Sequence, residues 1–110
     1  MSQRLLIVDD NEMLAENICE FLRDEGYDVR VATNPEEALN LPCFDGYVLD
    51  VRMPGLDGWS LRQRLVERCD CARFVLMTAF QDPSHRPAGE TLNPLPKPIP
   101  FDRLLDQLQS

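Results

Sequence analysis

The sequence lacks any apolar run near the roughly 20 residues that a membrane-spanning helix needs, and no charged, apolar and small-residue leader follows Met1. Its formal net charge of −8 offers no basic patch for the phosphate backbone of a nucleic acid. We therefore expect a soluble, cytoplasmic protein that contacts neither a membrane nor nucleic acid directly. At 110 residues, of which 44% are hydrophobic, the chain suits one core, so we expect a single domain over residues 1–110.

Cysteine and histidine are not arranged as in a zinc site. The four cysteines follow none of the paired CxxC spacings, and a single histidine makes a closed four-ligand site hard to assemble. We therefore disfavour a soft-metal site at Cys69-Asp70-Cys71, and we interpret His85 as a surface residue. Because nothing indicates an oxidising compartment, we expect reduced thiols at all four cysteines, which are Cys19, Cys43, Cys69 and Cys71.

Strand-like segments alternate with segments of helical periodicity along most of the chain. Such alternation with short joins predicts a parallel sheet with helices on both faces. We expect an α/β, doubly wound, flavodoxin-like fold with a five-stranded parallel sheet in the order 2-1-3-4-5. The strand-like segments are 4–8, 27–31, 47–49 and 73–77, with a fifth just before Lys97; the helical segments begin near Asn11, Asn34, Gly58 and Phe101.

Apolar spacing predicts which face of each helix is buried. The first helix carries Leu14, Ile18, Phe21 and Leu22 on one face and stops at Gly26, and the last helix carries Phe101, Leu104, Leu105 and Leu108. In the helix after Gly58 we expect Leu61, Leu65 and Val66 to face inward and Arg62, Gln63, Arg64 and Glu67 to face outward. Tyr27, Val29 and Val31 alternate with charged residues, which is typical of a strand near a sheet edge.

Proline interrupts the pattern between residues 81 and 100. Six prolines stand there, at positions 83, 87, 94, 96, 98 and 100, with no run of helical period between them. Because proline removes a backbone donor and breaks a helix interior, we expect the fourth helix of the fold to be shortened or missing.

Polar residues gather where the predicted strands end. Asp9 and Asp10 follow the first strand, and Asp50 ends the third. The proposed strand order puts these two strands side by side, so the three carboxylates should share one cleft. Their mutual repulsion is tolerable if a cation neutralises it, and Mg²⁺ suits so few protein carboxylates better than Ca²⁺ does.

Thr78 ends the fourth strand and Lys97 follows the fifth. Taken singly, Asp50 could be a turn cap, Thr78 a β-branched strand residue and Lys97 a solvated lysine. Carboxylates, hydroxyl, lysine and metal together are typical of phosphoryl transfer to a carboxylate.

The chain resembles the receiver domain of a two-component response regulator. The resemblance rests, in the family's order, on Leu6-Ile7-Val8-Asp9-Asp10, on residues 48–58 (VLDVRMPGLDG), on Leu76-Met77-Thr78-Ala79 and on Lys97-Pro98. It implies a signalling switch, not an enzyme, in which Asp50 accepts a phosphoryl group from a sensor histidine kinase or a phosphotransfer protein. An output domain or protein would act downstream.

The resemblance also implies the role of each site residue. Asp10 would bind magnesium directly and Asp9 mainly through water, with Asp50 and the backbone carbonyl of Arg52 completing the protein ligands. Thr78 and Lys97 would contact the phosphoryl oxygens. The family usually has a full fourth helix and an aromatic residue three positions before the lysine, where this chain has Pro94. We therefore expect an altered switch and a loop at 81–93.

Three other functions fit the sequence less well. A magnesium-dependent phosphohydrolase would need a general acid two residues past its nucleophile, where this chain has Arg52. An interaction domain that no longer signals is favoured only by the altered segment 81–96. A flavin-binding module is disfavoured because the acidic residues 9–12 would repel a phosphate.

Overall fold

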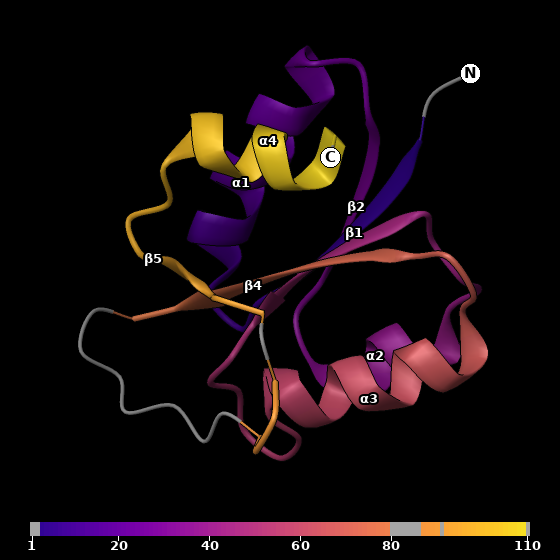
Figure 1. The fold of residues 1–110 in the computed structure, drawn as a ribbon. Helices are drawn as coiled ribbons and strands as arrows, with labels where there is room; N and C mark the ends of the chain where they lie inside the picture. The colour runs from indigo at the N-terminus through magenta and orange to yellow at the C-terminus, as the bar shows by residue number, and fades with distance from the viewer. Residues whose placement is uncertain (1–2, 80–86, 91, 110) are drawn as a thin grey trace.

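The computed structural model describes residues 3–79, 87–90 and 92–109. Five parallel strands form one sheet in the order β2-β1-β3-β4-β5. Helices α1 and α4 cover one face of this sheet and α2 and α3 cover the other (Figure 1). The predicted doubly wound, flavodoxin-like fold is confirmed.

The strands differ in burial according to their place in the sheet. They are β1 (Arg4–Val8), β2 (Asp28–Ala32), β3 (Gly46–Asp50), β4 (Arg73–Thr78) and β5 (Leu95–Pro96). Every residue of β3 is buried, because neighbours pair on both edges and helices cover both faces. In β2, at the sheet edge, Asp28 and Arg30 are exposed, as the alternating pattern predicted.

Side-chain caps set where three helices begin. The helices are α1 (Glu12–Asp24), α2 (Pro35–Asn40), α3 (Gly58–Arg68) and α4 (Phe101–Gln109). Asn11, Asn34 and Asp57 accept hydrogen bonds from the third backbone N–H that follows each of them, which satisfies a donor that the helix leaves free. Gly26, with φ of +98°, supplies the left-handed turn that ends α1.

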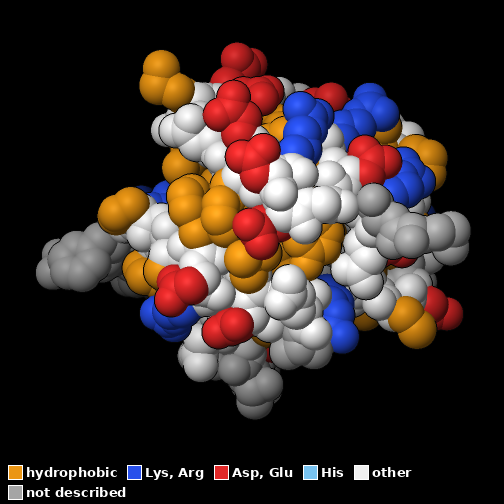
Figure 2. All heavy atoms as spheres, turned by 90° about the horizontal axis from the view of Figure 1, so that it is seen from above, with side chains coloured by type: hydrophobic (Ala, Val, Ile, Leu, Met, Phe, Trp, Pro, Cys, Tyr) orange, Lys and Arg blue, Asp and Glu red, His pale blue; other side chains and the backbone are white. Residues whose placement is uncertain are grey.

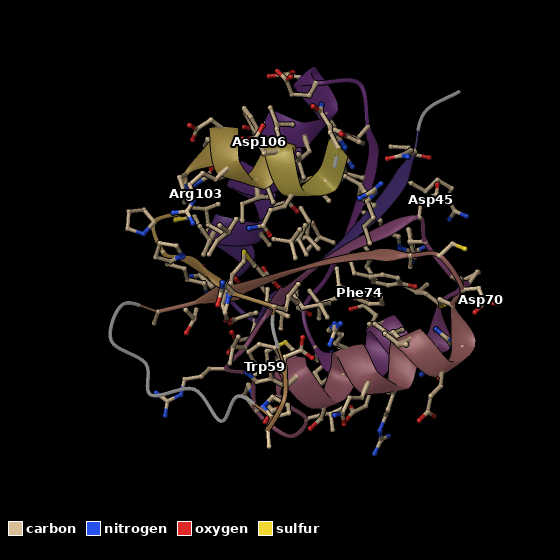
Figure 3. The ribbon with its side chains drawn as sticks, viewed as in Figure 1. Asp45, Trp59, Asp70, Phe74, Arg103 and Asp106 are labelled. Atoms are coloured by element: carbon tan, nitrogen blue, oxygen red, sulfur yellow. A yellow bond between two sulfur atoms is a disulfide. The ribbon has the colours of Figure 1, made fainter. Side chains whose placement is uncertain are left out.

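Two apolar layers, one on each face of the sheet, make up the core. The layer under α1 and α4 contains Ile7, Ile18, Leu22, Leu104 and Leu108. The layer under α2 and α3 contains Leu6, Tyr47, Leu49, Trp59 and Leu65. Trp59 lies in the first turn of α3 and Phe74 lies between α3 and the sheet (Figure 3).

One prediction about α3 is wrong. Val66 is 46% exposed, whereas Leu61 and Leu65 are fully buried. The helix touches the sheet with a narrow stripe, and Val66 lies about 100° around the axis from Leu65. Arg62, expected to face outward, is half-buried: its guanidinium lies 5.8 Å from the ring centre of Phe74.

The segment between β4 and β5 has no helix among residues 87–90 and 92–94. A turn closed by the Glu90 N–H on the Pro87 carbonyl (3.1 Å) is present instead. This agrees with the expected shortened or missing fourth helix. The predictions for Pro83 and His85, and part of the predicted loop at 81–93, lie outside the described residues.

The surface combines both signs of charge with apolar side chains. On the side that carries α1 and α4, acidic and basic side chains are interspersed, with hydrophobic side chains between them (Figure 2). Among the described residues, no helix is both long enough and apolar enough to cross a membrane.

The expectation of four reduced cysteines is wrong for Cys43 and Cys69, which form a disulfide. Cys43 precedes β3 and Cys69 follows α3, and their Cα atoms lie 5.6 Å apart. That separation lies in the range a disulfide can bridge. A sequence separation of 26 residues gave no local signal of this pairing. Cys19 is buried and free, and Cys71 is exposed and free.

Gly58 is predicted to tolerate no side chain. A Cβ atom there would lie 2.4 Å from the Asp50 carbonyl oxygen and 2.9 Å from the Val51 Cα, and neither backbone atom can move cheaply. We expect Gly58→Ala to destabilise the protein by about 2 kcal/mol or more in urea unfolding. Gly55→Ala is the control: no atom crowds that site, so it should cost only about 1 kcal/mol for its left-handed backbone. Equal losses in the two variants would contradict the close-approach argument.

Candidate functional site

The carboxyl ends of β1 and β3 bring three carboxylates together, as predicted. β1 pairs with β3 up to Val8 and Leu49, so the residues that follow lie side by side. One oxygen each from Asp9, Asp10 and Asp50 lies within 4.8 Å of the others. Asp9 is fully buried, Asp50 is 4% exposed, and Asp10 is exposed. The cluster is therefore anchored in the core and open to solvent on one side.

Lys97 joins this cluster from the other side of β3. Its Nζ lies 3.1 Å from Asp9 Oδ2 and 3.2 Å from Asp50 Oδ1, so it bridges two of the three carboxylates. The backbone holds it there, because the Lys97 N–H donates to the Thr78 carbonyl at 2.9 Å. The Lys97–Pro98 peptide bond is cis. Because its Nζ contacts two buried carboxylates, Lys97 is not the solvated surface lysine that was the alternative.

Backbone donors orient the two buried carboxylates. The Asn11 N–H donates to Asp9 Oδ1 at 2.9 Å, and the Arg52 N–H reaches Asp50 Oδ1 at 3.4 Å. Gly58, whose role the sequence analysis missed, packs its Cα against the backbone of residues 50 and 51 and donates to the Val51 carbonyl at 2.8 Å. A glycine at the first position of α3 was the sequence signal for this role. A larger residue at that position would push away the backbone of residues 50 and 51.

Thr78 ends β4, one residue beyond the pair formed by Asp50 and Met77. Its side chain is half-buried, and its hydroxyl donates to the Ala79 carbonyl at 3.4 Å. That is a long hydrogen bond, which a better acceptor could replace by rotation of the side chain. The side chain of Arg52 is exposed.

Burial and charge act in opposite directions on the two central groups. Burial, then the neighbouring Asp9, raises the pKa of Asp50 to about 6, and Lys97 only partly offsets them. Burial lowers the pKa of Lys97, but Asp50 and Asp9 outweigh it, so the net shift is upward. Lys97 is therefore a stable cation, while ionised Asp50 is held at a cost.

The donor set fits a hard divalent cation. Three carboxylates against one ammonium leave an excess of two negative charges when all are ionised, which a dication would neutralise. Carboxylate oxygens with an open, solvated side suit Mg²⁺, which keeps several waters. In the described part of the chain, this is the only such cluster found. The disfavoured set at Cys69-Asp70-Cys71 loses a thiolate to the disulfide.

Comparison with known proteins agrees with this geometry. The sequence model of the response regulator receiver domain matches residues 5–109. A response regulator receiver protein of Anaeromyxobacter sp. (strain Fw109-5) is 41% identical over 111 residues, which cover 94% of this chain and 46% of that protein. A crystal structure named for a response regulator of Chloroflexus aurantiacus is 35% identical, with a TM-score of 0.79 and 100% coverage of both chains.

A second solved structure is the response regulator protein TrrA of Thermotoga maritima, in complex with Mg(2+)-BeF. It is 34% identical, with a TM-score of 0.65 over 69% of each chain. The chain spans about half the length of the curated relatives it matches.

The raised pKa of Asp50 predicts how stability depends on pH in metal-free protein. Because the folded state binds this proton more tightly than the unfolded state, the contribution of Asp50 to stability falls as pH rises from about 4 to about 6. At about 1.4 kcal/mol per pKa unit, the loss is about 3 kcal/mol. Asp50→Asn carries no such proton, so in chelator its thermal midpoint should exceed that of the parent at pH 7.5 and the difference should shrink towards pH 4.5. A variant less stable than the parent at pH 7.5 would mean that Asp50 is a structural cap.

Proposed function

The chain belongs to the response regulator receiver domain family, and from this premise we propose that Asp50 accepts a phosphoryl group from a sensor histidine kinase or a phosphotransfer protein. The observation that carries the proposal is the position of Lys97 Nζ, 3.2 Å from Asp50 Oδ1 and 3.1 Å from Asp9 Oδ2. A cation at that point can contact an oxygen of a phosphoryl group attached to Asp50. The domain would act in the cytoplasm on an output domain or protein.

Asp50 supplies the nucleophile. At neutral pH a carboxyl group with a pKa of about 6 is mostly ionised. Its oxygen would form a bond to phosphorus while the bond from phosphorus to the donor's histidine nitrogen breaks. Lys97 would move its contact from the carboxylate to a phosphoryl oxygen. The Thr78 hydroxyl, whose hydrogen bond to the Ala79 carbonyl is long at 3.4 Å, would turn to donate to another phosphoryl oxygen.

Magnesium is the proposed cofactor. Asp9, Asp10 and Asp50, with the backbone carbonyl of Arg52, would hold it, and TrrA is named as a complex with Mg(2+)-BeF. When bound, the ion supplies positive charge that offsets the carboxylates and the incoming phosphoryl oxygens. Asp10 is the exposed member of the cluster and would keep the site open to the phosphodonor.

We propose a phosphorylated switch, not an enzyme. A phosphohydrolase needs a proton donor for its leaving group, and the side chain two residues past Asp50 is the exposed, permanently charged Arg52. The acyl phosphate would therefore persist long enough to signal. An interaction domain that is not phosphorylated would have no need for a lysine paired with two buried carboxylates, so we disfavour that alternative.

Phosphorylation is tested with a small phosphodonor and Mg²⁺, read by intact mass. We expect a gain of one phosphoryl group that decays over time, because an acyl phosphate is labile, and that is absent with chelator. Asp50→Asn should not label. Asp57→Asn is the matched control: Asp57 ends the loop that follows Asp50, and asparagine caps α3 as well as aspartate does, so labelling should remain near that of the parent. Labelling of Asp50→Asn at the parental level would refute the assignment.

The output route should differ from that of relatives with a fourth helix. Glu90 ties the segment before β5 to α3: its Oε2 lies 2.6 Å from an Arg62 nitrogen, and its Oε1 accepts the Leu92 N–H at 3.0 Å. The same segment leads through Pro94 and β5 to Lys97. A shift of Lys97 towards a phosphoryl group would therefore pull on a short strand and an ion pair, without moving an aromatic side chain.

Amide exchange tests this route. With beryllofluoride and Mg²⁺, protection should change at the amides of Glu90, Leu92 and Lys97, which bond the Pro87 carbonyl, the Glu90 carboxylate and the Thr78 carbonyl. The Asp28 amide, bonded to the Gln3 carbonyl at the far edge of the sheet, should not change. Changes confined to α1, with none in residues 87–97, would contradict the proposal.

A further inference from the structure

Cys43 and Cys69 lie at the end of the sheet opposite Asp50. Cys43 precedes the amino end of β3, while Asp50 stands at its carboxyl end. Figure 3 labels Asp45 and Asp70, the neighbours of this pair, at one end of the molecule, and Trp59 at the other end of α3. The disulfide closes a loop that contains β3, the phosphoacceptor and α3.

The two sulfurs are in different surroundings. Cys43 is exposed, whereas Cys69 is 4% exposed. The Tyr47 hydroxyl lies 3.4 Å from Cys69 Sγ and accepts the Phe44 N–H at 3.0 Å. Because that oxygen already accepts a hydrogen bond, its own proton is free to point at the sulfur. A thiolate from solvent would therefore attack Cys43 Sγ, and Cys69 would leave as a thiolate that Tyr47 stabilises.

The pair is held together by more than the bond itself. The Arg68 guanidinium donates to the Leu39 carbonyl at 2.5 Å and to the Leu41 carbonyl at 3.1 Å. These contacts join the segment before Cys43 to the last turn of α3, immediately before Cys69. The reduced thiols would stay close, which makes closure of the bond an intramolecular step at high effective concentration.

We propose that Cys43 and Cys69 form a reversible dithiol–disulfide site that exchanges with low-molecular-weight thiols and their disulfides. One thiolate attacks Cys43, the bond between Cys43 and Cys69 breaks, and Cys69 takes up a proton. A second thiolate then attacks the outer sulfur of the mixed disulfide, which releases Cys43 as a thiol and the small-molecule disulfide. Two electrons pass to the protein, and the reverse sequence oxidises it.

The site would give the domain an input separate from phosphorylation. In the cytoplasm, where the proposed function puts this domain, disulfides are usually transient and redox-sensing. The role as a second input rests on the proposed function, whereas the arrangement of Cys43, Cys69, Tyr47 and Arg68 does not.

The test counts thiols in the folded protein after equilibration in glutathione buffers of graded ratio. Samples are quenched with an alkylating reagent in denaturant and read by intact mass, so that all four cysteines can report. We expect two thiols to disappear together in one two-electron transition, and in the Cys71→Ser variant this transition should add no glutathione mass. Cys71→Ser is the matched control and should keep this transition, while Cys43→Ser should lose it. Arg68→Gln should shift the midpoint towards more oxidising buffers.

Two outcomes would overturn the proposal. Cys43 and Cys69 could each acquire glutathione independently, as a single exposed thiol would, which would mean that they do not act as a pair. The bond could also resist reduced glutathione until the protein unfolds, which would make it a structural cross-link. Asp50→Asn should titrate like the parent, so failure of this proposal and failure of the phosphorylation proposal are seen separately.

Discussion

The Lys97 ammonium lies between the carboxylates of Asp9 and Asp50 and holds together the strand ends that form the site. This contact joins the ends of β1 and β3 to the segment after β5. Asp9 and Lys97 are 88 residues apart in the sequence. Two buried carboxylates side by side would repel each other strongly without it. Lys97 offsets part of this repulsion and links the carboxylate cluster to the end of β5.

Burial of β3 has two effects on Asp50: it holds the residue in place, and it makes the ionised carboxylate costly. The strand is buried throughout, which makes it a rigid support for Asp50. The same burial, with Asp9 beside it, raises the pKa of Asp50 and makes its ionised form costly. The clustered carboxylates at the end of β3 therefore lower the stability of the folded protein. Binding of a cation, or protonation of Asp50, relieves this loss.

The two ends of β3 and α3 carry different chemistry. Asp50 and Gly58 lie at one end, and Cys43, Cys69 and the Arg68 contacts lie at the other. Helix α3 also carries Arg62, which binds Glu90 in the segment that leads to β5. Helix α3 therefore contacts the backbone beside Asp50, the segment before β5 and the disulfide. The packing of α3 on the sheet affects the position of all three.

The fold and the carboxylate cluster could be predicted from the sequence, because strand period, helix caps and residues at strand ends are local patterns. Asp9, Asp10, Asp50 and Lys97 were found in this way, since parallel order alone puts strand ends together. Three features became visible only in the folded chain: the disulfide between Cys43 and Cys69, the half-burial of Arg62 on Phe74, and the exposure of Val66. All three features depend on how α3 packs on the sheet. Helical periodicity predicts which face of the helix is buried, but it predicts neither the width of the buried stripe nor which distant residues contact it.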